Sequence, residues 1–338
     1  MSRRPTAEDI ERVFRGAPAR YTGGEAARAA GVSPELAERI WRALGFATLA
    51  DDTAAFTDAD VATLRRVKVV LAKNLWDERV VVRMARALGQ TTARLAQWQT
   101  EIMIGTMFDS PGRPGDEEAT RVFETAESLL PELEKMLVHV WRTQVAAAAG
   151  RLLAIAEVTD EVLPSRPPMA VGFADLVSFT RFSRELDEMA LAELVEGFEA
   201  RASDVVASYG GRLVKTLGDE VLFTATAARA AAEIALDLVE AIHADGNGPD
   251  VRAGLAYGPI LPTMGDVFGP TVNLAARLTT IARPATIIVD SAMAERLAGL
   301  PGLDVCRIRR RPARGLGTVQ PYVLRRAEPV IDANGRVE

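Results

Sequence analysis

Apolar residues in the first half of the chain recur every three or four positions, which is the spacing of amphipathic helices. This pattern predicts helices over 6–14, 21–30, 35–44, 60–71, 76–104 and 117–155. Residues 109–116 contain two prolines and two glycines and predict a break between the last two. Ser33 followed by Pro34 is typical of a helix start, because Ser caps the first turn and Pro fits its first position. With the preceding glycine turn, this predicts a helix-turn-helix within residues 21–70.

The pattern changes after a second, proline-rich break at 163–168, where short apolar runs begin to alternate with helical segments. Strands are predicted over 169–174, 212–215, 221–224, 251–257, 286–289 and 322–324, and helices over 191–209, 227–243 and 272–281. The order βαββαβ at the start predicts an α+β sandwich of ferredoxin-like type. We therefore expect an all-α domain at 1–112, linker helices at 113–165, an α+β domain at 166–328 and a tail at 329–338.

Composition narrows the class of protein. The 338 residues suit two domains better than one, and 40 basic against 46 acidic residues give a net charge of −6. That charge disfavours non-specific binding to nucleic acid. No apolar run approaches the roughly 20 residues that span a bilayer, so we expect no membrane span. Cys306 is the only cysteine and lies in a strand-like run, which predicts a packing residue in a reducing, cytoplasmic protein.

Two aspartates stand at the ends of predicted strands, far apart in the sequence. Asp175 ends an apolar strand, where a carboxylate is costly to bury unless a cation or donors satisfy it. Asp219 lies in a tight turn between two strands, and Gly-Asp is also ordinary turn chemistry. Together the two carboxylates could hold two Mg²⁺ ions about 4 Å apart. Loop amides after Asp175 could bind phosphate oxygens.

A third candidate set lies in the predicted helix 272–281. Asn273 and Arg277 are four residues apart, which places them on one helical face. Arg presents a planar fork suited to phosphate oxygens, and Asn can donate to and accept from a ribose. Taken alone, this spacing more often belongs to an ordinary polar face, and Asp266 upstream is a surface loop acid.

Together these segments resemble the catalytic domain of class III adenylyl cyclases. The first motif of that family, a strand ending in Asp and then a small loop with Phe-Thr, corresponds to Phe173-Ala-Asp175-Leu-Val-Ser-Phe-Thr180. The second corresponds to Lys215-Thr-Leu-Gly-Asp219. The third corresponds to Asp266-Val-Phe-Gly-Pro-Thr-Val-Asn273-Leu-Ala-Ala-Arg277. Order and spacing are kept, and the resemblance covers about half of the chain, 167–324.

The resemblance implies a role for each matched residue. Asp175 and Asp219 would hold two Mg²⁺ or Mn²⁺ ions per active site. Lys215 and Asp266 would bind the adenine of ATP, at positions where guanylyl cyclases carry Glu and a small residue. Asn273 would orient the ribose, and Arg277 would stabilise charge at the α-phosphate. Further substrate contacts would come from Phe179, Thr180 and Arg314, with Arg309, Arg310 and Arg311 as alternatives to the last.

The implied reaction is attack of the ribose 3′-hydroxyl on the α-phosphorus of ATP, which yields cyclic AMP and pyrophosphate by two-metal-ion catalysis. In the family the metal-binding pair comes from one chain and the base- and ribose-binding residues from another, which implies a homodimer with two equivalent sites. Two other functions stay open. One is a nucleotide-binding sensory or transcriptional protein without turnover, and the other is a guanylyl cyclase.

Residues 21–70 resemble a MerR-type helix-turn-helix, in which Arg39 and Arg42 would face DNA. Glu35 and Glu38 on the same helix favour a protein-interaction module instead, so we do not expect DNA as a partner. The two-part layout resembles actinobacterial adenylyl cyclases whose helical N-terminal domain restrains the catalytic pair. That likeness implies autoinhibition with a fatty acid or a proton as the regulatory input. His139 is a candidate pH switch, although a surface histidine is the simpler interpretation.

Overall fold

The computed structural model describes residues 6–46, 52–107, 115–159, 166–245, 248–313, 315 and 317–327. Contacts divide the chain into two units, Met1–Ala147 and Ala148–Glu338. The predicted break at 109–116 and the tail at 329–338 lie largely or wholly outside the described residues. Within the described ranges, no helix has both the length and the apolar composition that crossing a membrane requires.

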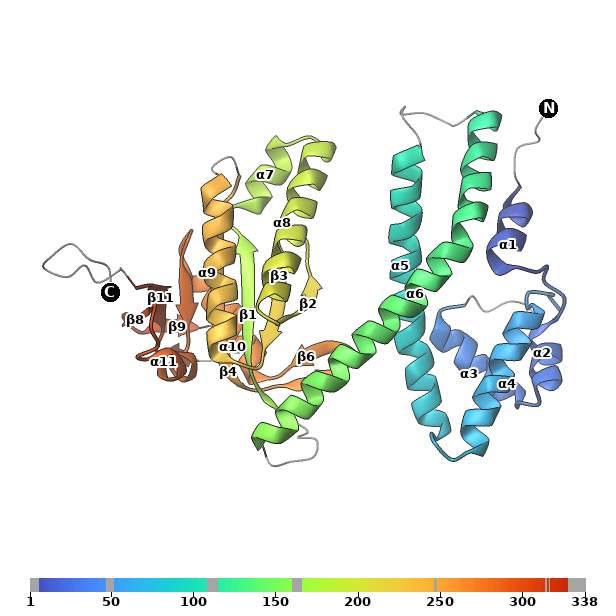
Figure 1. Ribbon diagram of the computed structural model, residues 1–338, viewed down its shortest axis with the longest axis horizontal. Helices are drawn as coiled ribbons and strands as arrows, with labels where there is room; N and C mark the ends of the chain where they lie inside the picture. Colours follow the sequence, from blue (N-terminus) through green and yellow to red (C-terminus); the bar gives the residue numbers. More distant parts are fainter. Residues whose placement is uncertain are drawn as a thin grey trace, which may run out of the picture. The chain divides into compact units, whose positions relative to one another are not determined.

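The first unit is helical, as predicted (Figure 1). Side-chain caps define its helix starts: Ser33 accepts from the Leu36 amide at the start of α3, and Thr22 and Thr57 form capping boxes at α2 and α4. Gly31 adopts a left-handed conformation that ends α2 and forms the turn between α2 and α3, where the sequence predicts a helix-turn-helix. The helices are α1 Ala7–Arg15, α2 Gly23–Ala30, α3 Pro34–Leu44, α4 Asp58–Ala72, α5 Glu78–Met107 and α6 Asp116–Thr159, the last of which crosses the boundary between the units.

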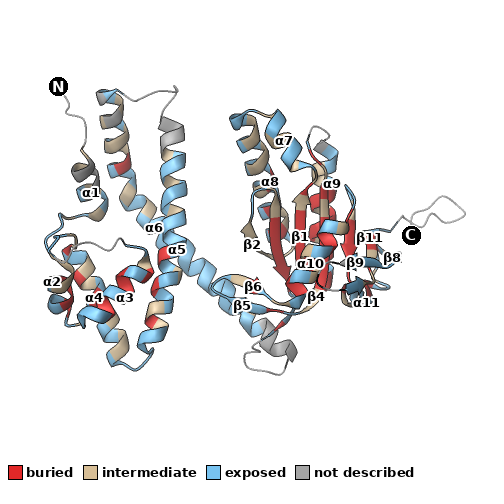
Figure 2. Ribbon diagram, turned by 180° about the vertical axis from the view of Figure 1, so that it is seen from behind, coloured by how far each residue is buried: buried red, intermediate tan, exposed pale blue. Residues whose placement is uncertain are grey.

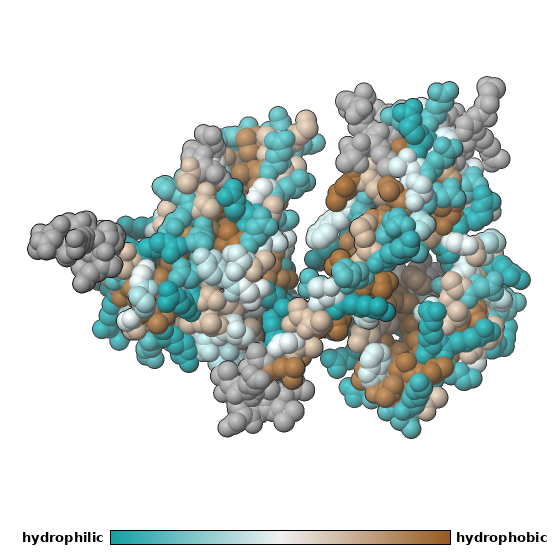
Figure 3. Space-filling view, in the orientation of Figure 1, coloured by the Kyte–Doolittle hydropathy of each residue, from teal (hydrophilic) through white to brown (hydrophobic). Residues whose placement is uncertain are grey.

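The core of this unit is small. Ala26, Ile40 and Leu64 are buried together, and Trp41 stacks on Phe56 with ring centroids 4.0 Å apart. Outside that core many large apolar side chains are exposed on α5 and α6, and Figure 3 shows hydrophobic residues at the surface of this unit. Burial is therefore concentrated where α2, α3, α4 and the first half of α5 meet (Figure 2).

The second unit contains a seven-stranded sheet in the order β2-β3-β1-β4-β7-β11-β8. Its first four strands, with α8 and α9 between them, form the predicted ferredoxin-like arrangement, because β1 lies antiparallel between β3 and β4. The strands are β1 Pro168–Leu176, β2 Arg212–Thr216, β3 Glu220–Ala225, β4 Val251–Pro259, β7 Ile287–Val289, β8 Leu303–Arg307 and β11 Tyr322–Arg326.

Helices cover both faces of this sheet, and two cores result. The first core joins the sheet to α8 Glu188–Ser208, α9 Ala228–Asp245 and α11 Ser291–Leu297, and the second joins it to α10 Pro270–Ile281. Along β1, Ala170 and Ala174 belong to the first core, and Val171 and Phe173 to the second. Because side chains alternate along a strand, Asp175 falls on the α10 face. The buried strands and α10 appear together in Figure 2.

Short elements are where the sequence-based expectations were wrong or incomplete. The small loop expected after Asp175 is a turn at 177–178, and the helix that follows it, α7 Phe179–Glu185, was not predicted. Asp266 lies in a strand and not in a loop. Two hairpins, β5 Leu261–Thr263 with β6 Asp266–Phe268 and β9 Arg311–Ala313 with β10 Gly317–Val319, have strands too short for a recognisable period. Cys306 is exposed and does not pack in a core, because Leu303 and Val305 of β8 lie on the face of the first core and Cys306 lies on the other face.

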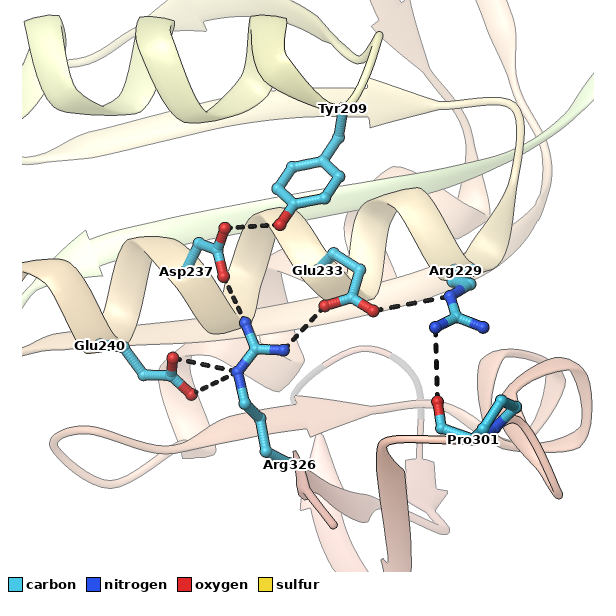
Figure 4. A network of polar contacts seen from close by, with 7 residues as sticks. All are labelled: Tyr209, Arg229, Glu233, Asp237, Glu240, Pro301 and Arg326. Carbon is cyan, nitrogen blue, oxygen red and sulfur yellow. Dashed lines mark hydrogen bonds and ion pairs between the residues drawn. The ribbon is translucent and has the colours of Figure 1, made fainter. Parts of the chain in front are cut away.

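Arg326 ties the strand β11 to α9 (Figure 4). Its guanidinium donates to Glu233 and Glu240, at 2.9 Å each, and to Asp237. The Tyr209 hydroxyl at the end of α8 donates to the other oxygen of Asp237 at 2.6 Å. On the same helix, Arg229 donates to the Pro301 carbonyl at 3.4 Å. These contacts join β11 and the loop before β8 to the helical layer.

Gly254 sets the distance between α10 and the sheet. A Cβ atom built there would lie 2.2 Å from the Thr279 amide nitrogen and 2.6 Å from the Ala275 carbonyl oxygen. Both atoms belong to the backbone of α10, so no side-chain rotation could relieve the clash. The close approach of α10 to β4 therefore requires glycine at this position.

We expect Gly254→Ala to lower the free energy of unfolding by about 1–3 kcal/mol, because α10 must move away from the sheet. Thermal unfolding followed by circular dichroism measures the effect. Gly197→Ala is the matched control, since Gly197 lies inside α8 and a Cβ atom there meets nothing within 4 Å. The free energy of unfolding of this control should rise by about 0.5–1 kcal/mol, because alanine is favoured over glycine inside a helix. Equal midpoints of thermal unfolding for Gly254→Ala and the unmodified chain would show that the close approach of α10 does not require glycine.

Candidate active site

The structure brings Asp175 and Asp219 to one end of the sheet. The Leu176 amide donates to the Asp219 carbonyl oxygen at 2.9 Å, which holds the β2–β3 turn beside the end of β1. Gly218 in that turn has a φ of +71°, a conformation that favours glycine. The backbone thus joins two segments that lie far apart in the sequence and carry the two predicted metal-binding carboxylates.

Arg252 is the cation that satisfies Asp175. It lies opposite Asp175 in the β1–β4 register, and its Nε and Nη2 atoms donate to Oδ2 at 2.8 and 2.6 Å. Its Nη1 atom also donates to the Thr280 carbonyl of α10 at 3.4 Å. The sequence analysis missed this residue. The available signal was a cation at the start of an apolar strand, which needs a carboxylate partner.

Glu220 adds a third carboxylate to this strand end, opposite Asp175 in the β1–β3 register. Burial raises the pKa of Asp175, the Arg252 guanidinium opposes that rise, and the Asp219 charge adds to it. Burial, followed by the charges of Asp175 and Asp219, raises the pKa of Glu220 to about 7. The sequence analysis missed Glu220 as well, although it directly follows Asp219. An excess of carboxylates over cations at this strand end favours the binding of positive charge.

The donor chemistry fits Mg²⁺ or Mn²⁺, which prefer hard oxygen ligands. Among the described residues, no group of three or more His, Cys, Asp or Glu side chains could hold a metal ion. Mg²⁺ in nucleotide-dependent enzymes is commonly held by one or two carboxylates together with substrate phosphates. Asp175 and Asp219 therefore fit a metal that arrives with a nucleotide better than a permanently bound one.

Lys215 and Asp266 form a second polar group, held between β2 and β6. The Lys215 Nζ atom lies 2.6 Å from Asp266 Oδ2, and the Val267 amide donates to Oδ1 at 2.8 Å. Burial acts to raise the pKa of Asp266, but the Lys215 and Val267 hydrogen bonds outweigh it and bring the pKa below its ordinary value. Both side chains are about one-third exposed or less, at 33% and 26%. The two residues predicted to bind a base therefore lie together and accessible.

Asn273 and Arg277 lie on α10, and both are exposed. Within the part of the chain that the structure describes, neither side chain has a hydrogen-bond or ion-pair partner. Phe179 packs half-buried against the first core, and Thr180 is exposed on α7. Arg314 lies outside the described residues. One chain thus presents the carboxylates at the end of the sheet, the Lys215–Asp266 pair on β2 and β6, and Asn273 and Arg277 on α10.

The raised pKa of Glu220 predicts a pH-dependent stability. Its pKa is about 7 in the folded chain and ordinarily 4.5, so the folded state binds the proton more tightly. The contribution of Glu220 to the free energy of unfolding is therefore fully present below about pH 4.5 and is lost as the pH rises through about 7. Glu220→Gln should remove this loss, which we expect to be about 1–2 kcal/mol because partial exposure screens the charges. Urea unfolding in EDTA at several pH values measures the free energy of unfolding.

Glu295→Gln, at an exposed position, is the control. If the free energy of unfolding depends on pH in the same way for Glu220→Gln and the unmodified chain, the raised pKa of Glu220 is contradicted.

Comparison with known proteins identifies the family. Residues 163–326 match the adenylate and guanylate cyclase catalytic domain, and residues 9–148 match the adenylate cyclase regulatory domain. The chain is 45% identical to an adenylate cyclase of Streptomyces coelicolor, over 96% of this chain and 91% of the relative. It is 48% identical to an adenylate cyclase of Streptomyces griseus, over 87% and 72%. The crystal structure of the adenylyl cyclase CyaB from P. aeruginosa aligns at 20% identity and a TM-score of 0.44, over 48% of this chain and 96% of that one. The chain belongs to the adenylate cyclases in which a helical regulatory domain precedes a class III catalytic domain.

Proposed function

We propose that this adenylate cyclase converts ATP to cyclic AMP and pyrophosphate by two-metal-ion catalysis, in an active site shared by two copies of the chain. One observation carries the proposal: a single chain holds two carboxylates at one end of the sheet, a donor and acceptor pair suited to adenine on β2 and β6, and an exposed Asn and Arg on α10. Two copies facing each other would complete two equivalent sites.

Asp175 and Asp219 would hold the divalent ions, two Mg²⁺ or Mn²⁺ per site. Bound there, such ions lower the pKa of the ribose 3′-hydroxyl and neutralise the leaving pyrophosphate. The register of β1 positions Asp175. Asp219 is positioned by its turn, whose backbone is held by the hydrogen bond from the Leu176 amide to the Asp219 carbonyl. Phe179 and Thr180, on the helix that follows Asp175, and Arg314 remain proposed contacts to the substrate.

Lys215 and Asp266 favour adenine over guanine by their hydrogen-bonding types. Lys215 donates to a ring nitrogen, and Asp266 accepts from the exocyclic amine. Guanine presents a donor and a carbonyl oxygen at the corresponding positions, so both contacts would be mismatched. Each buried mismatch costs about 1–3 kcal/mol, which is why we favour ATP over GTP.

Asn273 and Arg277 would act on the ribose and the α-phosphate. Both project from α10, whose position Gly254 and the Arg252–Thr280 contact determine. A fixed guanidinium beside the developing charge contributes about 3 kcal/mol or more to the transition state. This set also argues against a domain that binds nucleotide without turnover, which has no use for it.

Co-expression of two inactive variants tests both the roles and the shared site. We expect Asp175→Ala to abolish cyclic AMP production and Arg277→Ala to lower kcat about 100- to 1000-fold. Differently tagged copies of these two variants, purified as a mixed pair, should regain activity, because one of the two sites then contains every required residue.

The matched control pairs Asp175→Ala with Asp219→Ala, which damage the same proposed half-site and should stay inactive together. Each purified mixed pair of the first kind has one intact site of two, so about half of the unmodified activity should return. Equal activity in the two mixtures would refute the shared site. Full activity of either aspartate variant alone would refute the metal assignment.

We further propose that the helical unit inhibits the catalytic one and that a proton or a fatty acid is its input. The match of residues 9–148 to a regulatory domain supports a regulatory role. DNA remains a partner we do not propose, because Arg39 pairs with Glu78 at 2.9 Å and Arg42 pairs with Glu38. Those ion pairs engage both arginines of the helix that would contact DNA.

His139, exposed on α6, is the proposed proton acceptor. Replacing its imidazole with His139→Gln should flatten the dependence of full-length activity on pH. His243→Gln is the control, because His243 lies in the other unit, with Nδ1 2.8 Å from Asp250 Oδ1. An unchanged pH–activity profile for His139→Gln would exclude His139 as the switch.

A further inference from the structure

The hairpin that carries Asp266 is small and lies apart from the main sheet. Strands β5 and β6 have three residues each and pair only with each other within the described chain. All three residues of β5 are exposed, and Val267 is the one buried residue of β6. A two-stranded hairpin of this size is at best marginally stable by itself. The position of Asp266 therefore depends on contacts from outside the hairpin.

Besides the packing of Val267 in the second core, strand β2 supplies two polar contacts through two cations. Lys215 binds the Asp266 carboxylate at 2.6 Å. Arg212, three residues earlier, donates from Nη2 to the backbone carbonyl of Gly265, the residue that precedes Asp266. Met264 and Gly265 both have positive φ values, of 56° and 79°, so the tip is a tight turn. The Arg212 guanidinium thus holds the turn from which Asp266 projects.

The two contacts differ in what happens when a nucleotide arrives. If Lys215 donates to the adenine ring, its ammonium is shared between the base and Asp266. The Arg212 contact is made to a backbone carbonyl and involves no atom that the base needs. The hydrogen bond from Arg212 to Gly265 therefore still joins β2 to the hairpin when a nucleotide is bound.

We propose that Arg212 is a positioning residue for substrate selection: by holding the Gly265 carbonyl, it keeps Asp266 where it accepts a hydrogen bond from the exocyclic amine of adenine. This inference rests on the proposed base-binding role of Asp266. Arg212 touches neither the base nor the reacting atoms. Its effect appears in the discrimination between purines and in KM, not in the chemical step.

The test compares ATP with purine riboside triphosphate, which lacks the exocyclic amine. The ratio of their kcat/KM values measures the contact between Asp266 and that amine. For the unmodified full-length chain we expect a ratio of about 10 to 100. Arg212→Met, which keeps the length of the side chain but no donor, should lower the ratio about five- to tenfold through a higher KM for ATP, with kcat changed less than about twofold.

Two further variants keep the test decisive. Arg212→Lys retains a long cationic donor and should keep most of the ratio. Arg229→Met removes another guanidinium that donates to a backbone carbonyl, that of Pro301, away from the hairpin (Figure 4). Its ratio should equal that of the unmodified chain. If Arg212→Met fails to fold by circular dichroism, the ratio for Arg212→Gln, which keeps a neutral donor, should lie between those of the unmodified chain and Asp266→Ala.

Asp266→Ala, which removes the acceptor, separates the role of Asp266 from that of Arg212. If it lowers the ratio to about 1 and Arg212→Met leaves the ratio unchanged, the role of Arg212 is refuted and the proposed function stands. If Asp266→Ala itself leaves the ratio unchanged, base recognition by Asp266 is refuted, and the role of Arg212 with it. Equal losses of kcat for both substrates in Arg212→Met would also overturn the positioning role, because a general structural defect has that signature.

Discussion

The antiparallel pairing of β1 with both β3 and β4 is the constraint on which the catalytic unit depends. It places Glu220, Asp175 and Arg252 side by side across three strands, at the end of the sheet where the β2–β3 turn also arrives. A shift of one residue in either register would turn a charged side chain from the α10 face into the other core. The apolar residues of β1 that alternate between the two cores resist such a shift. The chemistry at the strand end is thus positioned by packing several residues away.

How far the sequence predicts this arrangement depends on the length of each element. The long strands and helices are recognisable from their periodicity, and the three spaced motifs are enough to identify the candidate residues. Arg252 was not recognised as the partner of Asp175, because register depends on turn geometry and packing between strands 77 residues apart. Helix α7 and strand β6 have seven and three residues, which is too short for a period to be distinguished. Cys306 was misplaced because a strand-like run does not reveal which face of the strand is covered by the core.

The polar residues of the proposed site differ in whether they are paired within one chain. Asp175 has Arg252, and Asp266 has Lys215. Asn273 and Arg277 have no side-chain partner among the described residues. A pair within the chain avoids the cost of an isolated, partly buried charge before ligands arrive. The exposed guanidinium of Arg277 is solvated by water and needs no partner within the chain. It can therefore bind an anion such as a phosphate that comes from outside the chain.

The strand order also has a consequence for synthesis on the ribosome. Strand β8 is joined to the sheet through β11 alone, and β11 is the last strand of the described chain. A nascent chain therefore exposes the edge of β7, and leaves β8 without a hydrogen-bonding neighbour, until the residues up to Arg326 have left the exit tunnel. Arg326 then engages the acidic side chains of α9, which is synthesised earlier. The edge of the sheet is therefore completed by the strand that is synthesised last among the seven, and the catalytic fold can close only once the residues up to Arg326 are available.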